Sequence, residues 1–186
     1  LDWDRKKQLV TTQDRVNIER GNMVTTANGA RGEPNLKKIN LQKHVRVNIN
    51  PDTKGKSKEQ DAKKKIVIIC SGPLQIDYDK NIATFNKNVK VNTQDALINS
   101  DIMDVYFGKA GKDSSVSKEE ASALGSDMGS KIDKIIARGN VKITRSENIS
   151  YSDEATYDAL DKKITLSGNP RLIIYSSEDM NASLGN

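Results

Sequence analysis

Apolar and polar residues alternate in several separate stretches of the chain, which are 39–49, 83–91, 135–143 and 164–174. Successive side chains of a β-strand point to opposite faces, so this alternation predicts strands with one apolar face and one polar face. No segment with a comparable helical period of apolar residues dominates the chain. The pattern therefore predicts an all-β fold in which antiparallel strands stack through their apolar faces.

A nine-residue motif recurs five times, at 10–18, 39–47, 83–91, 135–143 and 164–172. Each copy begins with an apolar residue, continues through a short polar turn, and ends with apolar, polar and apolar residues. Motifs that recur along a chain in this way are typical of a stack of similar structural units, none of which can bury its apolar face alone. We therefore predict one domain over residues 1–186, built from about five units.

The polar centres of the motifs predict tight turns. They are Gln42–His44, Asn86–Asn88, Arg138–Asn140 and Ser167–Asn169, and Gly and Asn tolerate the positive φ that such turns need. Each motif is thus expected to be a short strand, a hairpin turn and the start of the next strand.

A second element recurs between the motifs, where Ser100–Phe107 aligns with Ser152–Asp158. The alignment places Met103 and Ala155 on one face, so each unit is expected to hold two or three strands.

Insertions at about 51–65 and 108–130 separate the middle motifs and are expected to be exposed loops. The first is rich in lysine, which fits either a solvated loop or a basic patch for an anionic group. The last apolar stretch, 171–175, is a candidate edge strand that could pair with another sheet.

Composition narrows the classes of function. Hydrophobic residues are 35% of the chain and aromatic residues 4%, which is thin for a compact core but adequate for a stack. So few aromatic side chains argue against nucleic-acid binding by base stacking. The net charge of +5 permits an acidic partner without requiring one. The sequence contains no run of 18 apolar residues, which is the length that a membrane-spanning helix needs. Because the chain begins at Leu1 rather than Met, we expect that a signal or anchor preceded it.

Catalytic and metal-binding patterns are missing from the sequence. The single histidine, His44, falls in a turn, and the single cysteine, Cys70, falls in an apolar strand where a buried structural thiol is expected. No Cys/His cluster has metal-ligand spacing, and no carboxylates pair for acid–base chemistry. We therefore predict a protein that is not an enzyme and has no cofactor or metal.

The parity of the motifs predicts which residues line an apolar interior. They are Leu41, Val45, Val47, Phe85, Val89, Val91, Ala137, Val141, Ile143, Leu166 and Leu172. Four cations share the eighth position of their motifs: Arg46, Lys90, Lys142 and Arg171. They are either outward charges that keep a sheet soluble, or contacts for an anionic head group at the rim of a groove.

These motifs resemble the OstA-type repeat of the bacterial lipopolysaccharide transport (Lpt) proteins. The resemblance rests on Ala137–Thr144, Ser152–Tyr157 and Lys163–Leu172 in order, and on 71–91 and 100–106. The first 50 residues are similar to the membrane-anchored C component, and the C-terminal half to the soluble periplasmic A component.

The resemblance implies a β-jellyroll, an open twisted stack folded like a taco, that holds the acyl chains of lipopolysaccharide in its interior. It also implies a periplasmic protein that joins other Lpt jellyrolls, or copies of itself head to tail, in a bridge from the inner-membrane transporter to the outer membrane. The alternative is a structural β-repeat scaffold without lipid cargo. A filled interior favours the scaffold and an open apolar cleft favours the carrier. A polysaccharide-active enzyme on a similar scaffold is disfavoured, because the sequence lacks the clustered carboxylates that such an enzyme needs.

Overall fold

The computed structural model describes residues 1–20, 23–49, 65–107, 132–161 and 163–174, which contain twelve β-strands in one antiparallel sheet and no α-helix. The strands are β1 (Asp2–Asp4), β2 (Leu9–Arg20), β3 (Met23–Glu33), β4 (Lys38–Ile49), β5 (Ile66–Cys70), β6 (Leu74–Asp77), β7 (Ile82–Asn92), β8 (Leu97–Phe107), β9 (Ile132–Arg145), β10 (Asn148–Asp158), β11 (Lys163–Ser167) and β12 (Arg171–Ile173). One turn of 3-10 helix, Pro34–Leu36, precedes β4. The all-β prediction is confirmed, whereas almost all of both predicted insertions lies outside the described residues.

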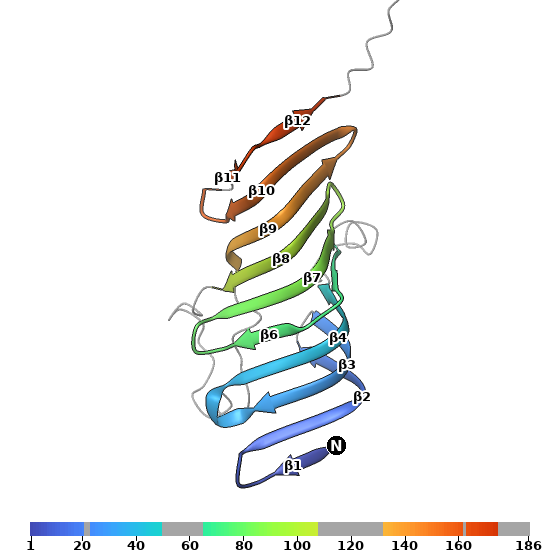
Figure 1. The fold of residues 1–186 in the computed structure, drawn as a ribbon, viewed down its shortest axis with the longest axis vertical. Helices are drawn as coiled ribbons and strands as arrows, with labels where there is room; N and C mark the ends of the chain where they lie inside the picture. The colour runs from blue at the N-terminus through green and yellow to red at the C-terminus, as the bar shows by residue number, and fades with distance from the viewer. Residues whose placement is uncertain (21–22, 50–64, 108–131, 162, 175–186) are drawn as a thin grey trace, which may run out of the picture.

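The strands stack in chain order along the long axis, from β1 at the N-terminal end to β11 and β12 at the other (Figure 1). Two levels of the stack are divided between two short strands. β5 and β6 lie end to end between the long strands β4 and β7, and β11 and β12 both pair with β10. The stack therefore has two halves, which we call the first arm, containing β6 and β11, and the second arm, containing β5 and β12.

A line of corners joins the two arms. The motif strands turn where a residue has positive φ, as at His44 (50°), Asn88 (54°) and Asn140 (48°). At the β7 corner the pairing with β8 shifts from Asn86 to Val89, so that the motif strand holds one residue more than its partner. Such a β-bulge bends a strand without ending it.

The predicted hairpin turns are therefore wrong. β4, β7 and β9 each run through their motif as one continuous strand, and only the last motif is divided, into β11 and β12. Gly and Asn in the motif centres do adopt positive φ, as predicted. One or two such residues inside a β-bulge, however, bend the strand and do not reverse its direction. The number of repeated units stays a prediction.

The core lies between the two arms and is densest in the middle of the stack. Its largest fully buried side chains are Leu41, Leu74, Met103, Val45, Val89 and Val141. Two of them, Leu41 and Leu74, are paired neighbours in the first arm, and Val45 lies across the corner in the second. Each arm therefore buries its apolar face against the other arm.

Candidate functional site

The interior between the arms is lined by columns of mostly apolar side chains that run along the stack. One column of the first arm, taken in order of strand pairing, is Leu41, Leu74, Phe85, Met103, Ala137, Ala155 and Leu166. One column of the second arm is Thr25, Val47, Ile68, Val91, Ile98, Ile143, Ser150 and Leu172. Column positions pair directly across strands, so each column is a continuous strip along the interior.

The eleven residues predicted to line the interior all fall on this inner face. Eight are buried: Leu41, Val45, Val47, Phe85, Val89, Val91, Ala137 and Val141. Ile143 and Leu166 are half-buried, and Leu172 is 62% exposed because β12 ends the stack and no further strand covers it among the described residues. Their contact with lipid stays a prediction.

Motif parity missed the interior residues that lie outside the motifs. Met103 and Val105 of β8, and Ile68 and Cys70 of β5, are all buried in the same core. The alignment of 100–107 with 152–158 did place Met103 and Ala155 on one face, and their pairing with Ala137 from either side confirms that prediction.

The interior is nearly filled in the middle of the stack. A cavity of about 60 Å³ remains between the arms, among side chains that include Val47, Ile68, Phe85 and Val105. This space is far below the roughly 300–1,000 Å³ of typical small-molecule pockets, so it does not hold a fatty acyl chain as it stands. An acyl chain can enter this region only if the arms separate or their side chains repack.

The ends of the interior are less covered than its middle. Trp3 of β1 is 61% exposed and Ile164 of β11 is 53% exposed, and both are large apolar side chains. Isolated exposed apolar residues are ordinary, but these lie at the two terminal strands of an open stack. Apolar surface is thus available where another sheet could continue the stack.

The same hydrogen bond between an asparagine and an aspartate side chain recurs at the two corners nearest the C-terminus. Asn140 Nδ2 donates to Asp101 Oδ2 at 2.8 Å, and Asn169 Nδ2 donates to Asp153 Oδ2 at 3.4 Å. A Cβ on Gly139 would lie 2.4 Å from Asp101 Oδ2, so the carboxylate approaches the backbone where only glycine fits. At the β7 corner Asn88 Nδ2 donates to Ser71 Oγ at 3.1 Å.

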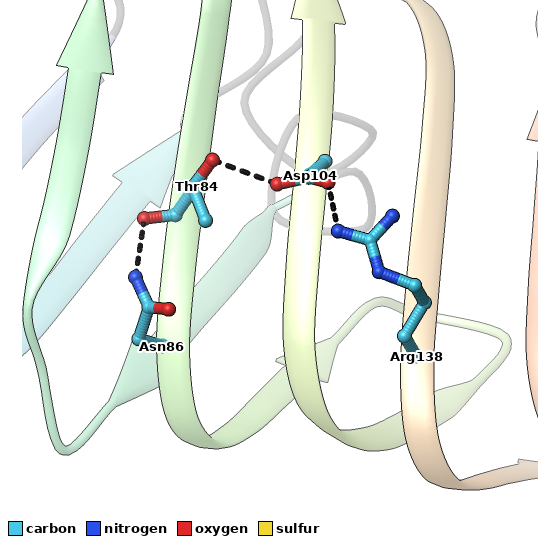
Figure 2. A network of polar contacts seen from close by, with 4 residues as sticks. All are labelled: Thr84, Asn86, Asp104 and Arg138. Carbon is cyan, nitrogen blue, oxygen red and sulfur yellow. Dashed lines mark hydrogen bonds and ion pairs between the residues drawn. The ribbon is translucent and has the colours of Figure 1, made fainter.

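A second polar group ties together the outer faces of β7, β8 and β9 (Figure 2). Thr84 Oγ1 donates to Asp104 Oδ1 at 2.7 Å, and the guanidinium of Arg138 forms an ion pair with Asp104 Oδ2. The Asp104 side chain is only 7% exposed, whereas that of Arg138 is 41% exposed. Asn86 Nδ2 extends the group by donating to the carbonyls of Thr84 and Pro73. The sequence alone does not reveal this ion pair, because Asp104 and Arg138 meet only through the strand register.

The four predicted head-group cations lie on the outer face of the second arm. Arg46, Lys90 and Lys142 each follow an inward residue along their strand, and Arg171 precedes the inward Leu172, so the four side chains point away from the interior. Lys142 and Arg171 flank the ring of Tyr151, at 5.7 and 5.5 Å from its centroid, which supports cation–π attraction. The structure does not place these cations inside the groove, and their contact with a head group stays a prediction.

Chemistry other than binding finds little support in the described residues. Burial raises the pKa of the Cys70 thiol, although hydrogen bonds from the backbone of Asn86 and Gly72 oppose the shift, so a reactive thiolate is disfavoured. No group of three or more His, Cys, Asp or Glu side chains in the described part of the chain could hold a metal ion. Within the same residues, no helix has the length and hydropathy to cross a membrane.

Comparisons with known proteins agree with this architecture. The family model described as "LptA/(LptD N-terminal domain) LPS transport protein" matches residues 68–184, and the model "Lipopolysaccharide-assembly, LptC-related" matches residues 1–50. No curated protein sequence matches the chain. The crystal structure of LptH from Pseudomonas aeruginosa, described as the LptA-homologous periplasmic component of the lipopolysaccharide transport device, superposes with a TM-score of 0.54. The alignment covers 83% of this chain and 95% of LptH at 10% identity, and it confirms the predicted β-jellyroll. Because the first family model matches more than half of the sequence, the chain belongs to the LptA/LptD N-terminal domain family of lipopolysaccharide transport proteins.

Proposed function

We propose that this protein is a periplasmic lipopolysaccharide carrier that shields acyl chains between its two arms and forms part of a bridge between the inner and outer membranes. The observation that carries the proposal is the pair of continuous, mostly apolar columns inside a chain of this transport family. Apolar walls remove fatty chains from water, and each methylene so buried contributes about 0.8 kcal/mol.

Loading requires the arms to move apart, since the cavity of about 60 Å³ between them is far smaller than the roughly 300–1,000 Å³ of typical small-molecule pockets. The arms are joined by the corners, where residues such as Asn140 hold positive φ, and elsewhere meet through apolar side chains. Dispersion and hydrophobic contacts carry no directional requirement, so acyl chains can replace the contacts between the arms without leaving polar groups unpaired. The family matched by the chain consists of transport proteins, and we propose no catalytic step.

The filled interior is also the observation that favours the alternative, a structural scaffold without lipid cargo. Native mass spectrometry of the purified protein separates the two functions. A carrier is expected to retain a lipid whose mass fits lipopolysaccharide, whereas a scaffold retains none.

Photo-crosslinking tests which face contacts the lipid. A photoreactive residue at Val89 or Val141 is expected to capture lipopolysaccharide, because both side chains are about 1% exposed on the inner face. The matched controls are Lys90 and Lys142, the next residue along each strand, which point to the outer face. Equal capture from all four positions would contradict an interior site, and capture from the lysines alone would favour the head-group role of the cations.

We further propose that the stack continues into another Lpt jellyroll or a second copy at its terminal strands. β12 is a three-residue strand, shorter than the edge predicted over 171–175, and among the described residues it pairs only with β10. Its exposed apolar side chains would be covered by an added strand, as in other cases of sheet extension.

Replacing Leu172 with lysine tests this assembly. Leu172 is already 62% exposed, so Leu172→Lys is expected to leave the melting temperature of the monomer nearly unchanged while it weakens association at least tenfold, through a charge placed in the new contact. The control is Leu160→Lys, because Leu160 is 87% exposed in the β10–β11 turn, at the opposite end of β10 from β12. Sedimentation at increasing protein concentration measures association, and equal behaviour of both variants would argue against assembly through β12.

A further inference from the structure

Two buried hydroxyl groups in the interior have no hydrogen-bond partner among the described residues. They are the Oγ atoms of Ser100 in β8 and Ser152 in β10, in residues that are 5% and 6% exposed. A buried hydroxyl without a partner destabilises a folded protein, and native structures contain few of them. Two unpartnered hydroxyl groups at aligned positions of the repeated segments 100–107 and 152–158 therefore require an explanation.

Both serines lie on the inner face of the second arm, directly beside the corners. Ser100 pairs with Val89, and Ser152 pairs with Val141. Because Asn99 pairs with Lys142, Val141 lies between the two serines, which are thus two strands apart, or roughly 10 Å. The hydroxyls form a short polar row inside an otherwise apolar wall.

The side chains across the corners become smaller toward β10. Met103 lies across the β8 corner from Ser100, whereas Ala155 lies across the β10 corner from Ser152, and Ala137 of β9 lies between them in the same column. Ser150, in the next inward position along β10, adds a third hydroxyl toward the open edge. Toward β10 the first-arm column therefore carries smaller side chains, and the second arm carries hydroxyl groups.

We infer that Ser100 and Ser152 form hydrogen bonds with an oxygen atom on the hydrocarbon part of a bound lipid, so that this end of the interior selects acyl chains that carry a hydroxyl or ester oxygen. The inference rests on the proposed acyl-chain binding and specifies which chains are preferred. A serine hydroxyl can donate to an ester carbonyl and can both donate to and accept from a hydroxyl. A plain alkyl chain leaves both serines unpaired, which is a form of selection stronger than shape alone provides.

The test compares two fatty acids of the same length, tetradecanoic acid and 3-hydroxytetradecanoic acid, by displacement of a fluorescent fatty acid from the full chain. The measured quantity is the ratio of their dissociation constants. The double variant Ser100→Ala/Ser152→Ala is expected to lower the preference for the hydroxylated acid about threefold to tenfold, as expected for the loss of one net hydrogen bond. The affinity for tetradecanoic acid is expected to stay within about twofold.

Ser167→Ala is the matched control, because Ser167 is an exposed serine paired with Glu154 on the outer face. It is expected to behave as the wild type. The melting temperature of the unliganded double variant is expected to be unchanged or higher, since the lost hydroxyls have no partner there.

Different failures separate this inference from the function beneath it. If the wild type binds neither acid, the proposal of acyl-chain binding is wrong, and the proposed role of the two serines is wrong as well. If the wild type binds both acids and the double variant keeps the same ratio, only the serine role is wrong. A sharp fall in the melting temperature of the unliganded double variant would also overturn it, since the hydroxyls would then be paired inside the empty protein.

Discussion

Replacing Gly139 with alanine is expected to lower the free energy of unfolding by about 2–4 kcal/mol. Gly139 has a φ of 74°, and a residue with a Cβ pays about 1–2 kcal/mol to adopt that region. The new methyl group would also lie 2.4 Å from Asp101 Oδ2 and 3.0 Å from the Asp101 Cβ, and overpacking of this kind costs about 1–3 kcal/mol. At this chain length the melting temperature is expected to fall by roughly 5–15 °C.

Gly32→Ala is the matched control for this substitution. Gly32 also lies in a long strand, but its φ is not positive and no atom lies within 4 Å of the added methyl group. Thermal unfolding of Gly32→Ala is expected to match the wild type. Adding Asp101→Ala to Gly139→Ala removes the closest contact, with Oδ2, and leaves the Asp101 Cβ contact and the backbone strain, so the double variant is expected to recover part of the loss. A Gly139→Ala protein as stable as the Gly32→Ala protein would show that the corner does not need glycine.

The corner matters to the proposed site because it places two interior residues on opposite arms. Ala137 precedes Gly139 in the first arm, and Val141 follows it in the second, and both are at most 3% exposed. A corner that opened or straightened would turn one of them away from the interior. Loss of stability at Gly139 is therefore expected to accompany loss of lipid capture at Val141.

The motif strands could be read from the sequence because their corners preserve parity. In β7 the inward residues Phe85 and Val89 are four positions apart, so the alternation of apolar and polar residues continues through the corner. All eleven predicted interior residues belong to motif copies, and all are found on the inner face. The antiparallel hairpin was the natural but wrong interpretation of the same turn residues.

The strands between the motifs could not be read in this way because their corners shift parity. In β8 the inward residues Ser100 and Met103 are only three positions apart, since this strand has one residue fewer at the corner than β7. Strict alternation from Met103 places Ser100 on the outer face. The two unpartnered serines were thus visible as an aligned pair in the sequence, but their burial depends on a bulge that only the register reveals.

The polar group on the outer face was hidden for a related reason. Asp104 lies opposite Ile136 and Arg138 lies opposite Ile102, so the ion pair is diagonal across β8 and β9. No spacing in the sequence marks a diagonal contact between residues 34 positions apart. The same holds for Lys142 and Arg171, whose shared column was predicted while their common contact with Tyr151 was not.

Replacing Asp104 with alanine is expected to lower the free energy of unfolding by about 2–3 kcal/mol. The carboxylate is 7% exposed and accepts hydrogen bonds from Thr84 and Arg138, so its loss removes two partners at once. Removing one member of a buried ion pair typically costs about 3–5 kcal/mol, and the lower value follows because Arg138, at 41% exposure, can turn its charge toward water. Asp95→Ala, at an exposed aspartate in the β7–β8 turn, is the control and is expected to change stability by less than about 0.5 kcal/mol.

A double-mutant cycle shows whether the pair or the aspartate alone carries the effect. Arg138→Met keeps most of the side-chain stem and removes the charge, so in the wild-type background it is expected to destabilise through the loss of the ion pair. In the Asp104→Ala background the same change is expected to cost much less, because the guanidinium no longer has its carboxylate. The coupling free energy from urea unfolding of the four proteins is expected to be about 1–2 kcal/mol. Additive effects would mean that Asp104 stabilises β7 and β8 through Thr84 and that Arg138 contributes only its packing.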